Sequence, residues 1–154
     1  MKLAGLKAAR IVALYCGLVV GGSAGAAVID IDNGELAKLV AAGVPLIDIR
    51  TSPEWQQTGV VPGSHLVTFF DERGTADPAA WLDKARTISK PGDPVIVICR
   101  TGNRTKAVSQ FLSSQAGYAK VYNVKNGISA WTRDGGAVVP LAQHMAGCRK
   151  SNAC

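Results

Sequence analysis

Apolar and polar positions alternate along residues 28–139 in two distinct rhythms. Short, β-branched apolar runs of strand length are separated by longer segments in which apolar residues recur at helical spacing. This alternation is typical of an α/β domain with a mostly parallel central sheet of about five strands, flanked by helices. The strands are expected at Val28–Ile31, Pro45–Ile49, Ser64–Phe70, Val95–Cys99 and Lys120–Val124.

Helices are expected between these strands, because capping residues and glycines punctuate the intervening segments. Asn33 and Ser52 are the expected caps of the first two helices. The predicted helices begin at Asn33, Ser52, Asp77, Thr105 and Ile128. No internal repeat or linker interrupts this pattern, so residues 28–140 are expected to form one domain, and residues 141–154 a C-terminal tail with two cysteines.

The first 26 residues have the pattern of a cleavable secretory signal. Its basic residues are Lys2, Lys7 and Arg10. They precede a ten-residue apolar core, Ile11–Val20, and an Ala24-Gly25-Ala26 exit of small residues. Because a spanning helix needs about 20 apolar residues, cleavage is favoured over the alternative of an uncleaved anchor. We therefore expect export to the bacterial periplasm, with no stable membrane anchor after cleavage.

The net charge of +6 arises from 17 Lys and Arg against 11 Asp and Glu. Three of the basic residues and none of the acidic ones lie in the leader, so the mature chain carries +3. A net charge of +3 is too small to indicate the extended basic surface of a nucleic-acid-binding protein. We therefore expect no nucleic-acid partner. A charged fraction of only 18% also argues against a disordered chain.

The segment Val95–Thr105 carries the candidate chemistry, because a cysteine leaves a buried strand and enters a polar loop that opens a helix. Amides without partners at the helix start, together with two arginines in the loop, favour the thiolate of Cys99. Gly102 permits the turn, and Thr105 is an expected helix cap. The alternative is a buried structural thiol. Six consecutive polar or glycine residues follow Cys99, and they favour a reactive thiol over a structural one.

At this point the sequence resembles the rhodanese-like family of sulfurtransferases, over nearly all of residues 28–139. The motifs that carry the resemblance are Leu46–Arg50 with Glu54-Trp55, Gly59–Ser64, the Cys99–Thr105 loop, and Gly117-Tyr118 through Asn126–Trp131. Val60 stands where the family commonly has a histidine, and Asn126 where it has the first glycine of a pair. The resemblance implies a rhodanese-like three-layer fold.

The resemblance also implies a ping-pong transfer with Cys99 as the catalytic residue. Its thiolate attacks the outer sulfur of thiosulfate, sulfite leaves, and the Cys99 persulfide passes its sulfur to cyanide or to a thiol, including a protein thiol. No metal and no cofactor other than this covalent persulfide are implied. The anion-binding loop would consist of Arg100, Thr101, Gly102, Asn103, Arg104 and Thr105.

Other conspicuous residues have structural interpretations. Asp48, Arg50 and Glu54 are expected to form a structural ion pair beneath the loop, because paired charges satisfy buried groups. The three tryptophans, Trp55, Trp81 and Trp131, are expected in the core.

Two other functions compete with the enzyme hypothesis. A phosphatase or arsenate reductase needs one more residue between cysteine and arginine than the four that separate Cys99 from Arg104. A persulfide carrier in a periplasmic sulfur relay, with little turnover on free thiosulfate, would retain the same loop. The sequence does not separate this carrier from an enzyme.

The C-terminal cysteines leave a further choice open. Cys148 and Cys154 are expected to form a small disulfide, and the alternative is that one of them resolves the Cys99 persulfide. Without a histidine cluster no zinc site is expected there. His144 is interpreted as a solvated tail residue, and His65 as a strand residue.

Overall fold

A computed structural model describes residues 26–151 of the chain, and the predicted leader (except Ala26) and Cys154 lie outside these residues. In the described part, five parallel strands form a sheet in the order β1-β5-β4-β2-β3. The strands are β1 (Ala27–Ile31), β2 (Leu46–Asp48), β3 (His65–Leu66), β4 (Val95–Ile98) and β5 (Lys120–Val124).

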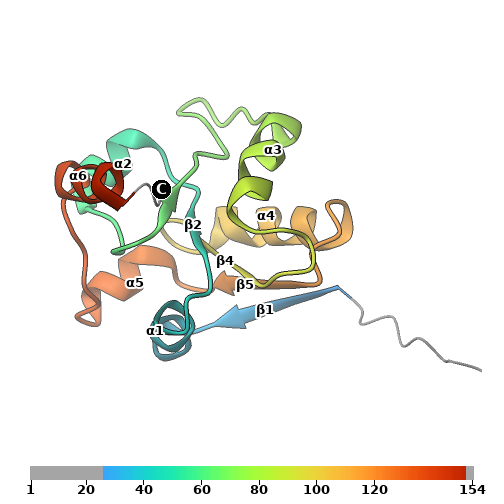
Figure 1. The fold of residues 1–154 in the computed structure, drawn as a ribbon, viewed down its shortest axis with the longest axis horizontal. Helices are drawn as coiled ribbons and strands as arrows, with labels where there is room; N and C mark the ends of the chain where they lie inside the picture. Colours follow the sequence, from blue (N-terminus) through green and yellow to red (C-terminus); the bar gives the residue numbers. More distant parts are fainter. Residues whose placement is uncertain (1–25, 152–154) are drawn as a thin grey trace, which may run out of the picture.

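Helices cover both faces of this sheet, which confirms the predicted three-layer α/β fold (Figure 1). The helices are α1 (Asn33–Ala41), α2 (Ser52–Thr58), α3 (Pro78–Ile88), α4 (Asn103–Ser114), α5 (Gly127–Arg133) and α6 (Leu141–Ser151). None of the helices in the described segment is long and apolar enough to cross a membrane.

The central strand β4 explains why two cores form. All four of its side chains are fully buried, and they alternate between the two faces of the sheet. Val95 and Val97 join the cluster that contains residues of α3 and α4. Ile96 and Ile98 join the cluster that contains residues of α1 and α5. The chain after β4 therefore starts from a strand that is fixed on both sides.

The first two helix caps differ from the sequence prediction by one residue each. Asp32, not Asn33, caps α1, and its side chain accepts a hydrogen bond from the amide of Glu35 at 2.9 Å. Thr51, not Ser52, occupies the cap position of α2. In both cases a second residue with good capping chemistry lies next to the expected one, so composition alone does not fix the helix start.

Strand β3 is much shorter than the predicted Ser64–Phe70. The Val67 amide still bonds to the Asp48 carbonyl at 3.0 Å, but at Thr68 the side-chain hydroxyl, rather than an amide, donates to Arg50 at 2.7 Å. The Phe69 amide then bonds to the Ile49 carbonyl at 3.2 Å, so the backbone pairing becomes irregular at this point without ending. The following Phe69 is buried and packs edge-on against Trp81.

The segment after Pro140 forms helix α6, where only a tail was expected (Figure 1). Val60 and Val139 exchange two backbone hydrogen bonds that hold the entry to this helix. The expectation of a solvated His144 is wrong, because its side chain is only 6% exposed. Cys148 is disulfide-bonded. Its predicted partner, Cys154, lies outside the described residues, so that pairing stays a prediction.

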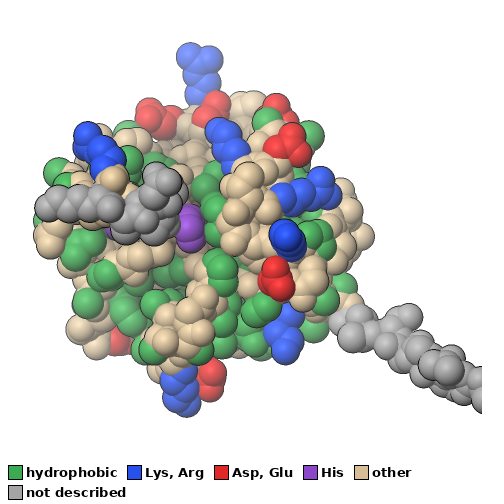
Figure 2. Space-filling view, in the orientation of Figure 1, with side chains coloured by type: hydrophobic (Ala, Val, Ile, Leu, Met, Phe, Trp, Pro, Cys, Tyr) green, Lys and Arg blue, Asp and Glu red, His purple; other side chains and the backbone are tan. Residues whose placement is uncertain are grey.

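Charged side chains of both signs are interspersed around the face shown in Figure 2. The positive excess therefore does not gather over one element in this view. Individual arginines and their partners, rather than the net charge, decide the electrostatics near the reactive loop.

Candidate active site

The candidate site lies where two neighbouring strands end. β2 and β4 are parallel neighbours, and the Ile49 amide extends their pairing with a 3.0 Å bond to the Ile98 carbonyl. The chain leaves β2 towards β3, but leaves β4 towards β5 on the other side. Ligands of open α/β sheets bind at such a switch point, outside the carboxyl ends of the strands. Arg50 and Cys99 begin the two loops there.

Cys99 is buried, with 1% of its surface exposed, and is a free thiol. The amide of Gly102 donates to its Sγ at 3.2 Å. The hydroxyl of Thr105 lies 3.6 Å from the same sulfur and donates to the Gly102 carbonyl at 2.9 Å. The Thr105 oxygen can accept from a thiol, and its proton can turn to a thiolate. Both contacts therefore suit a sulfur that changes its charge.

The loop's own carbonyls are held by the start of α5. The Ile128 amide donates to the Cys99 carbonyl at 2.9 Å, and the Ser129 amide donates to the Arg100 carbonyl at 3.0 Å. Gly127 makes this approach possible, since a Cβ there would run into the Cys99 carbonyl. The Asn126-Gly127 turn of the sequence thus has a defined role, which is to fix the loop backbone around Cys99.

Gly102 has a positive φ of 90° and occupies the cap position of α4. A Cβ at this position would collide with the Lys125 carbonyl. Helix α4 begins at Asn103, two residues before the predicted start, so Thr105 lies inside the first turn and bonds to a carbonyl instead of capping an amide. The corrected start places the first turn of α4 directly after the amide that bonds to Cys99.

Asp48 and Arg50 form a buried ion pair, with side-chain exposures of 0% and 1%. Arg50 Nη2 lies 2.7 Å from Asp48 Oδ2, and Nε lies 2.9 Å from Oδ1. The remaining guanidinium protons go to Thr58 Oγ1 at 2.6 Å and to the Gly59 carbonyl at 2.9 Å. The pair therefore joins the end of β2 to the end of α2, and Arg50 has its charge compensated inside the protein.

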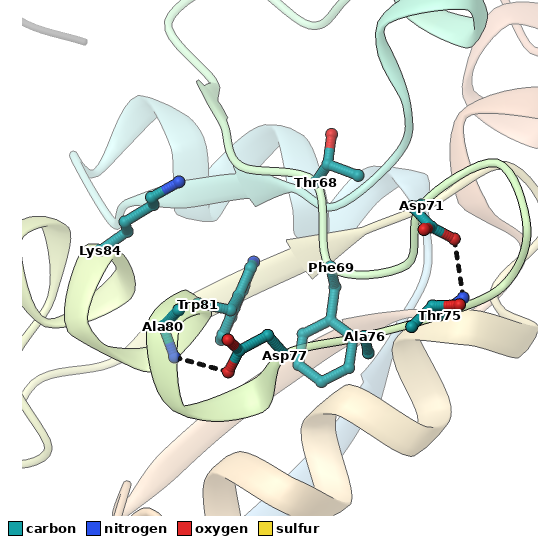
Figure 3. Close-up of a pocket in the computed structure, with 9 residues that line it drawn as sticks. All are labelled: Thr68, Phe69, Asp71, Thr75, Ala76, Asp77, Ala80, Trp81 and Lys84. Carbon is teal, nitrogen blue, oxygen red and sulfur yellow. Dashed lines mark hydrogen bonds between the residues drawn. The ribbon is translucent and has the colours of Figure 1, made fainter.

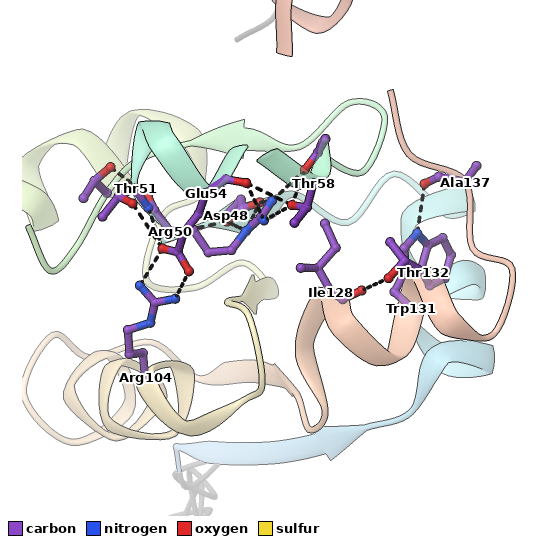
Figure 4. Close-up of polar contacts among 12 residues, drawn as sticks. Asp48, Arg50, Thr51, Glu54, Thr58, Arg104, Ile128, Trp131, Thr132 and Ala137 are labelled. Atoms are coloured by element: carbon purple, nitrogen blue, oxygen red, sulfur yellow. Dashed lines mark hydrogen bonds and ion pairs between the residues drawn. The ribbon is translucent and has the colours of Figure 1, made fainter. Parts of the chain in front are cut away.

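The sequence predicted that Glu54 joins Asp48 and Arg50 in one ion pair, and this part of the prediction is wrong. The Glu54 carboxylate instead binds Arg104 in a bidentate ion pair (Figure 4). The two distances are 2.6 Å and 2.9 Å. Arg50 reaches only the backbone carbonyl of Glu54, at 3.4 Å. The carboxylate also accepts from the amide and hydroxyl of Thr51, at 3.1 and 3.2 Å, which directs it towards α4.

The ion pair between Glu54 and Arg104 shifts the pKa values of the two side chains in opposite directions. Burial would raise the pKa of Glu54, but hydrogen bonds from Arg104 and Thr51 and the Arg104 charge outweigh it and lower the pKa to about 2. The pKa of Arg104 is raised, first by its hydrogen bond to Glu54 and also by the Cys99 sulfur. Arg104 is therefore a permanent cation that binds the Glu54 carboxylate and interacts with the reactive sulfur.

A cavity of about 240 Å³ opens beside the loop. It is lined by Arg50, Glu54, Gln57, Thr58, Arg100 and Ser129. Arg100, Thr101 and Asn103 are exposed, whereas Gly102 and Thr105 are buried around the sulfur. Gln57, Thr58 and Ser129 were not predicted from the sequence as site residues. Only Ser129 had a signal, its place in the start of the helix after the Asn126-Gly127 turn.

A second cavity, of about 310 Å³, lies between the Phe69–Thr75 segment and α3 (Figure 3). Its acidic side chains are occupied by backbone amides: Asp71 accepts from Thr75 at 2.7 Å, and Asp77 caps α3 through Ala80 at 3.0 Å. The indole of Trp81 donates to the Val67 carbonyl at 2.8 Å. These polar groups hold the protein together, whereas the cavity lined by Arg100 lies beside the Cys99 loop and is therefore the candidate active site.

Comparisons with known proteins identify a family for this chain. The sequence model described as "Rhodanese-like domain" matches residues 32–134. A sulfurtransferase of Allochromatium vinosum is 32% identical over 117 residues, which cover 71% of this chain and 94% of that protein. Thiosulfate sulfurtransferase 18 of Arabidopsis thaliana is 28% identical over 109 residues, or 68% of this chain and 78% of that protein.

Solved structures show the same fold. A protein from M. tuberculosis superposes with a TM-score of 0.63 at 23% identity, covering 75% of this chain and 99% of that one. A rhodanese-related protein from Thermoplasma volcanium gives a TM-score of 0.55 at 27% identity, covering 72% of this chain and 97% of that one.

Proposed function

The chain belongs to the rhodanese-like family, and from this premise we propose that it is a sulfurtransferase that takes sulfane sulfur from thiosulfate, or a similar anionic donor, through a persulfide on Cys99. The observation that carries the proposal is the 3.2 Å hydrogen bond from the Gly102 amide to Cys99 Sγ, at the first turn of α4. The names of the curated relatives, which include sulfurtransferases, support the same reaction class.

In the first half-reaction, the Cys99 thiolate attacks the outer sulfur of thiosulfate. A bond forms between Cys99 Sγ and that sulfur, the sulfur–sulfur bond of thiosulfate breaks, and sulfite leaves with the electron pair. The positive charge of Arg104 and the Gly102 amide stabilise the negative charge of the Cys99 thiolate before the transfer. They also stabilise the negative charge of the persulfide after it. Donors fixed in advance stabilise both states without rearranging.

In the second half-reaction, a thiolate or cyanide attacks the outer sulfur of the persulfide. The bond to Cys99 Sγ breaks, and its electron pair stays on Cys99 as the regenerated thiolate. The acceptor leaves as a persulfide or as thiocyanate. No resident metal or cofactor takes part in this proposed sequence, and a protein thiol is an acceptable second partner.

A steady-state assay of thiosulfate with cyanide tests the proposal. We expect thiocyanate formation by the wild type and none above background by Cys99→Ser. A persulfide that forms on Cys99 but does not turn over with cyanide or small thiols would instead support the carrier alternative. Absence of both persulfide and thiocyanate in the wild type would overturn the proposal.

We further propose that the chain is exported and that its leader is removed at or near Ala26, so that the domain acts in the bacterial periplasm. The support is the basic, apolar and small-residue order of residues 1–26. N-terminal sequencing of the protein recovered from the periplasmic fraction tests this. A mature protein that still starts at Met1 would contradict it.

A further inference from the structure

Arg50 and Arg100 line the cavity beside the Cys99 loop, Arg104 interacts with the Cys99 sulfur, and the three arginines differ in how their charge is compensated. Arg50 is paired with Asp48, and both side chains are almost completely buried. Arg104 is paired with Glu54, whose carboxylate it binds at 2.6 and 2.9 Å. Arg100 is exposed and lines the cavity, with no ion pair among the described residues.

The position of Glu54 is unusual for a site that receives anions. Glu54 lines the cavity, whereas Arg104 does not line it but binds the Glu54 carboxylate and interacts with the Cys99 sulfur. A donor in the cavity therefore meets a Glu54 carboxylate whose charge Arg104 compensates, so the pair contributes no net charge. Thr51 holds the carboxylate from the other side through two hydrogen bonds, so Glu54 cannot turn away without losing them.

We propose that Glu54 is a specificity-determining residue, which cancels the charge of Arg104 towards the donor and leaves Arg100 as the cation that attracts it. This inference rests on the proposed sulfurtransferase activity. The site is then tuned to donors of low charge, such as organic thiosulfonate monoanions, as much as to dianionic thiosulfate. Without Glu54, two uncompensated arginines would favour the dianion.

Two donors of nearly the same shape but different charge distinguish the effect of donor charge from that of donor shape. Thiosulfate is a dianion, and in methanethiosulfonate a methyl group replaces one of its oxygens, which leaves a monoanion. With either donor, Cys99 Sγ forms a bond to the outer sulfur and the donor's sulfur–sulfur bond breaks. Sulfite leaves in the first case and methanesulfinate in the second. The ratio of kcat/KM for thiosulfate to kcat/KM for methanethiosulfonate therefore reports the charge at the cavity.

The experiment measures this ratio in the wild type and in four variants. Glu54→Gln should raise the ratio about 3- to 10-fold, and Arg104→Gln and Arg100→Gln should each lower it by a similar factor, as expected for one unit charge within several ångströms at a partly solvated site. The double variant Glu54→Gln/Arg104→Gln should return to the wild-type ratio within about 2-fold, because a neutral pair has been replaced by two neutral residues.

The matched control is Arg86→Gln on α3, which removes the same charge from an exposed residue outside the cavity lining and should leave the ratio unchanged. A variant whose loop is merely damaged would lose activity with both donors alike. If Glu54→Gln does not fold, Arg104→Gln tests the same pair with the opposite sign.

The inference and the proposed function fail in different ways. If the wild type transfers sulfur from neither donor, the proposed function fails. If it transfers sulfur from both donors, but Glu54→Gln and Arg104→Gln keep the wild-type ratio, the activity stands and the role of Glu54 is overturned. A double variant that differs from the wild type as much as a single one would also contradict the cancellation.

Discussion

Arg104 Nη2 lies 2.6 Å from Glu54 Oε1, although the two residues are 50 positions apart in the sequence. Their contact joins the helix that follows Cys99 to the helix that follows the neighbouring strand β2. It therefore contributes both to the charge at the reactive loop and to the stability of the domain.

The first prediction concerns acid stability. The pKa of Glu54 is lowered from 4.5 to about 2 in the folded protein, so the unfolded state binds more protons between these values. The stabilisation from Glu54 is fully present above pH 4.5 and is lost as the pH falls towards about 2. Urea unfolding measured at a series of pH values should show this loss in the wild type and a smaller one in Glu54→Gln. Identical acid profiles for the two proteins would refute the prediction.

The second prediction concerns the buried pair of Asp48 and Arg50. Asp48→Ala leaves the Arg50 guanidinium buried without its counter-charge, and we expect a loss of about 3–5 kcal/mol in the free energy of unfolding. Asp83→Ala, on the exposed surface of α3, is the matched control and should change stability by less than about 0.5 kcal/mol. Denaturant unfolding measures both. A loss at Asp48 no larger than at Asp83 would show that the pair is not needed.

The third prediction concerns Gly127. It has a φ of 58°, and a Cβ there would run into the Cys99 carbonyl, so Gly127→Ala should displace the loop and reduce thiocyanate formation by at least about tenfold. Gly135→Ala is the control, because it also has a positive φ, 83°, but an added Cβ has no atom within 4 Å. Both variants carry a backbone cost of about 1 kcal/mol, and only Gly127→Ala should lose activity. Equal activities in the two variants would count against the role of Gly127.

The fourth prediction concerns His65. Burial, and to a lesser extent the neighbouring His144, lowers its pKa below 6.5. The unfolded state therefore takes up a proton first as the pH falls, and folding stability should decrease below about pH 6.5 until the pH passes the folded-state pKa. His65→Gln should flatten this part of the profile. The same slope in wild type and variant would assign it to other groups.

The sequence predicted the elements whose signals are local. The run Val95–Ile98 is apolar at every position, which identifies a strand buried on both faces, and the polar residues after Cys99 mark the loop that the structure places at its end. Asp77 followed by proline predicted the start of α3, and the structure confirms Asp77 as its cap.

Features that depend on distant residues escaped the sequence analysis. Glu54 pairs with Arg104 because of the way α2 and α4 are placed in the fold. No residue near Glu54 in the sequence indicates that Arg104 is its partner. Helix α6 contains as many polar as apolar residues and one glycine, and this mixture predicted only a tail. The burial of His144 results from the packing of this helix.

The central claim is that Cys99 accepts a sulfur atom from the donor. The most direct measurement is the intact mass of the mature protein after incubation with thiosulfate and removal of the excess. We predict a gain of one sulfur atom in the wild type, its loss on adding cyanide, and no gain in Cys99→Ser. A wild-type mass that stays unchanged, or an equal gain in Cys99→Ser, would contradict the account.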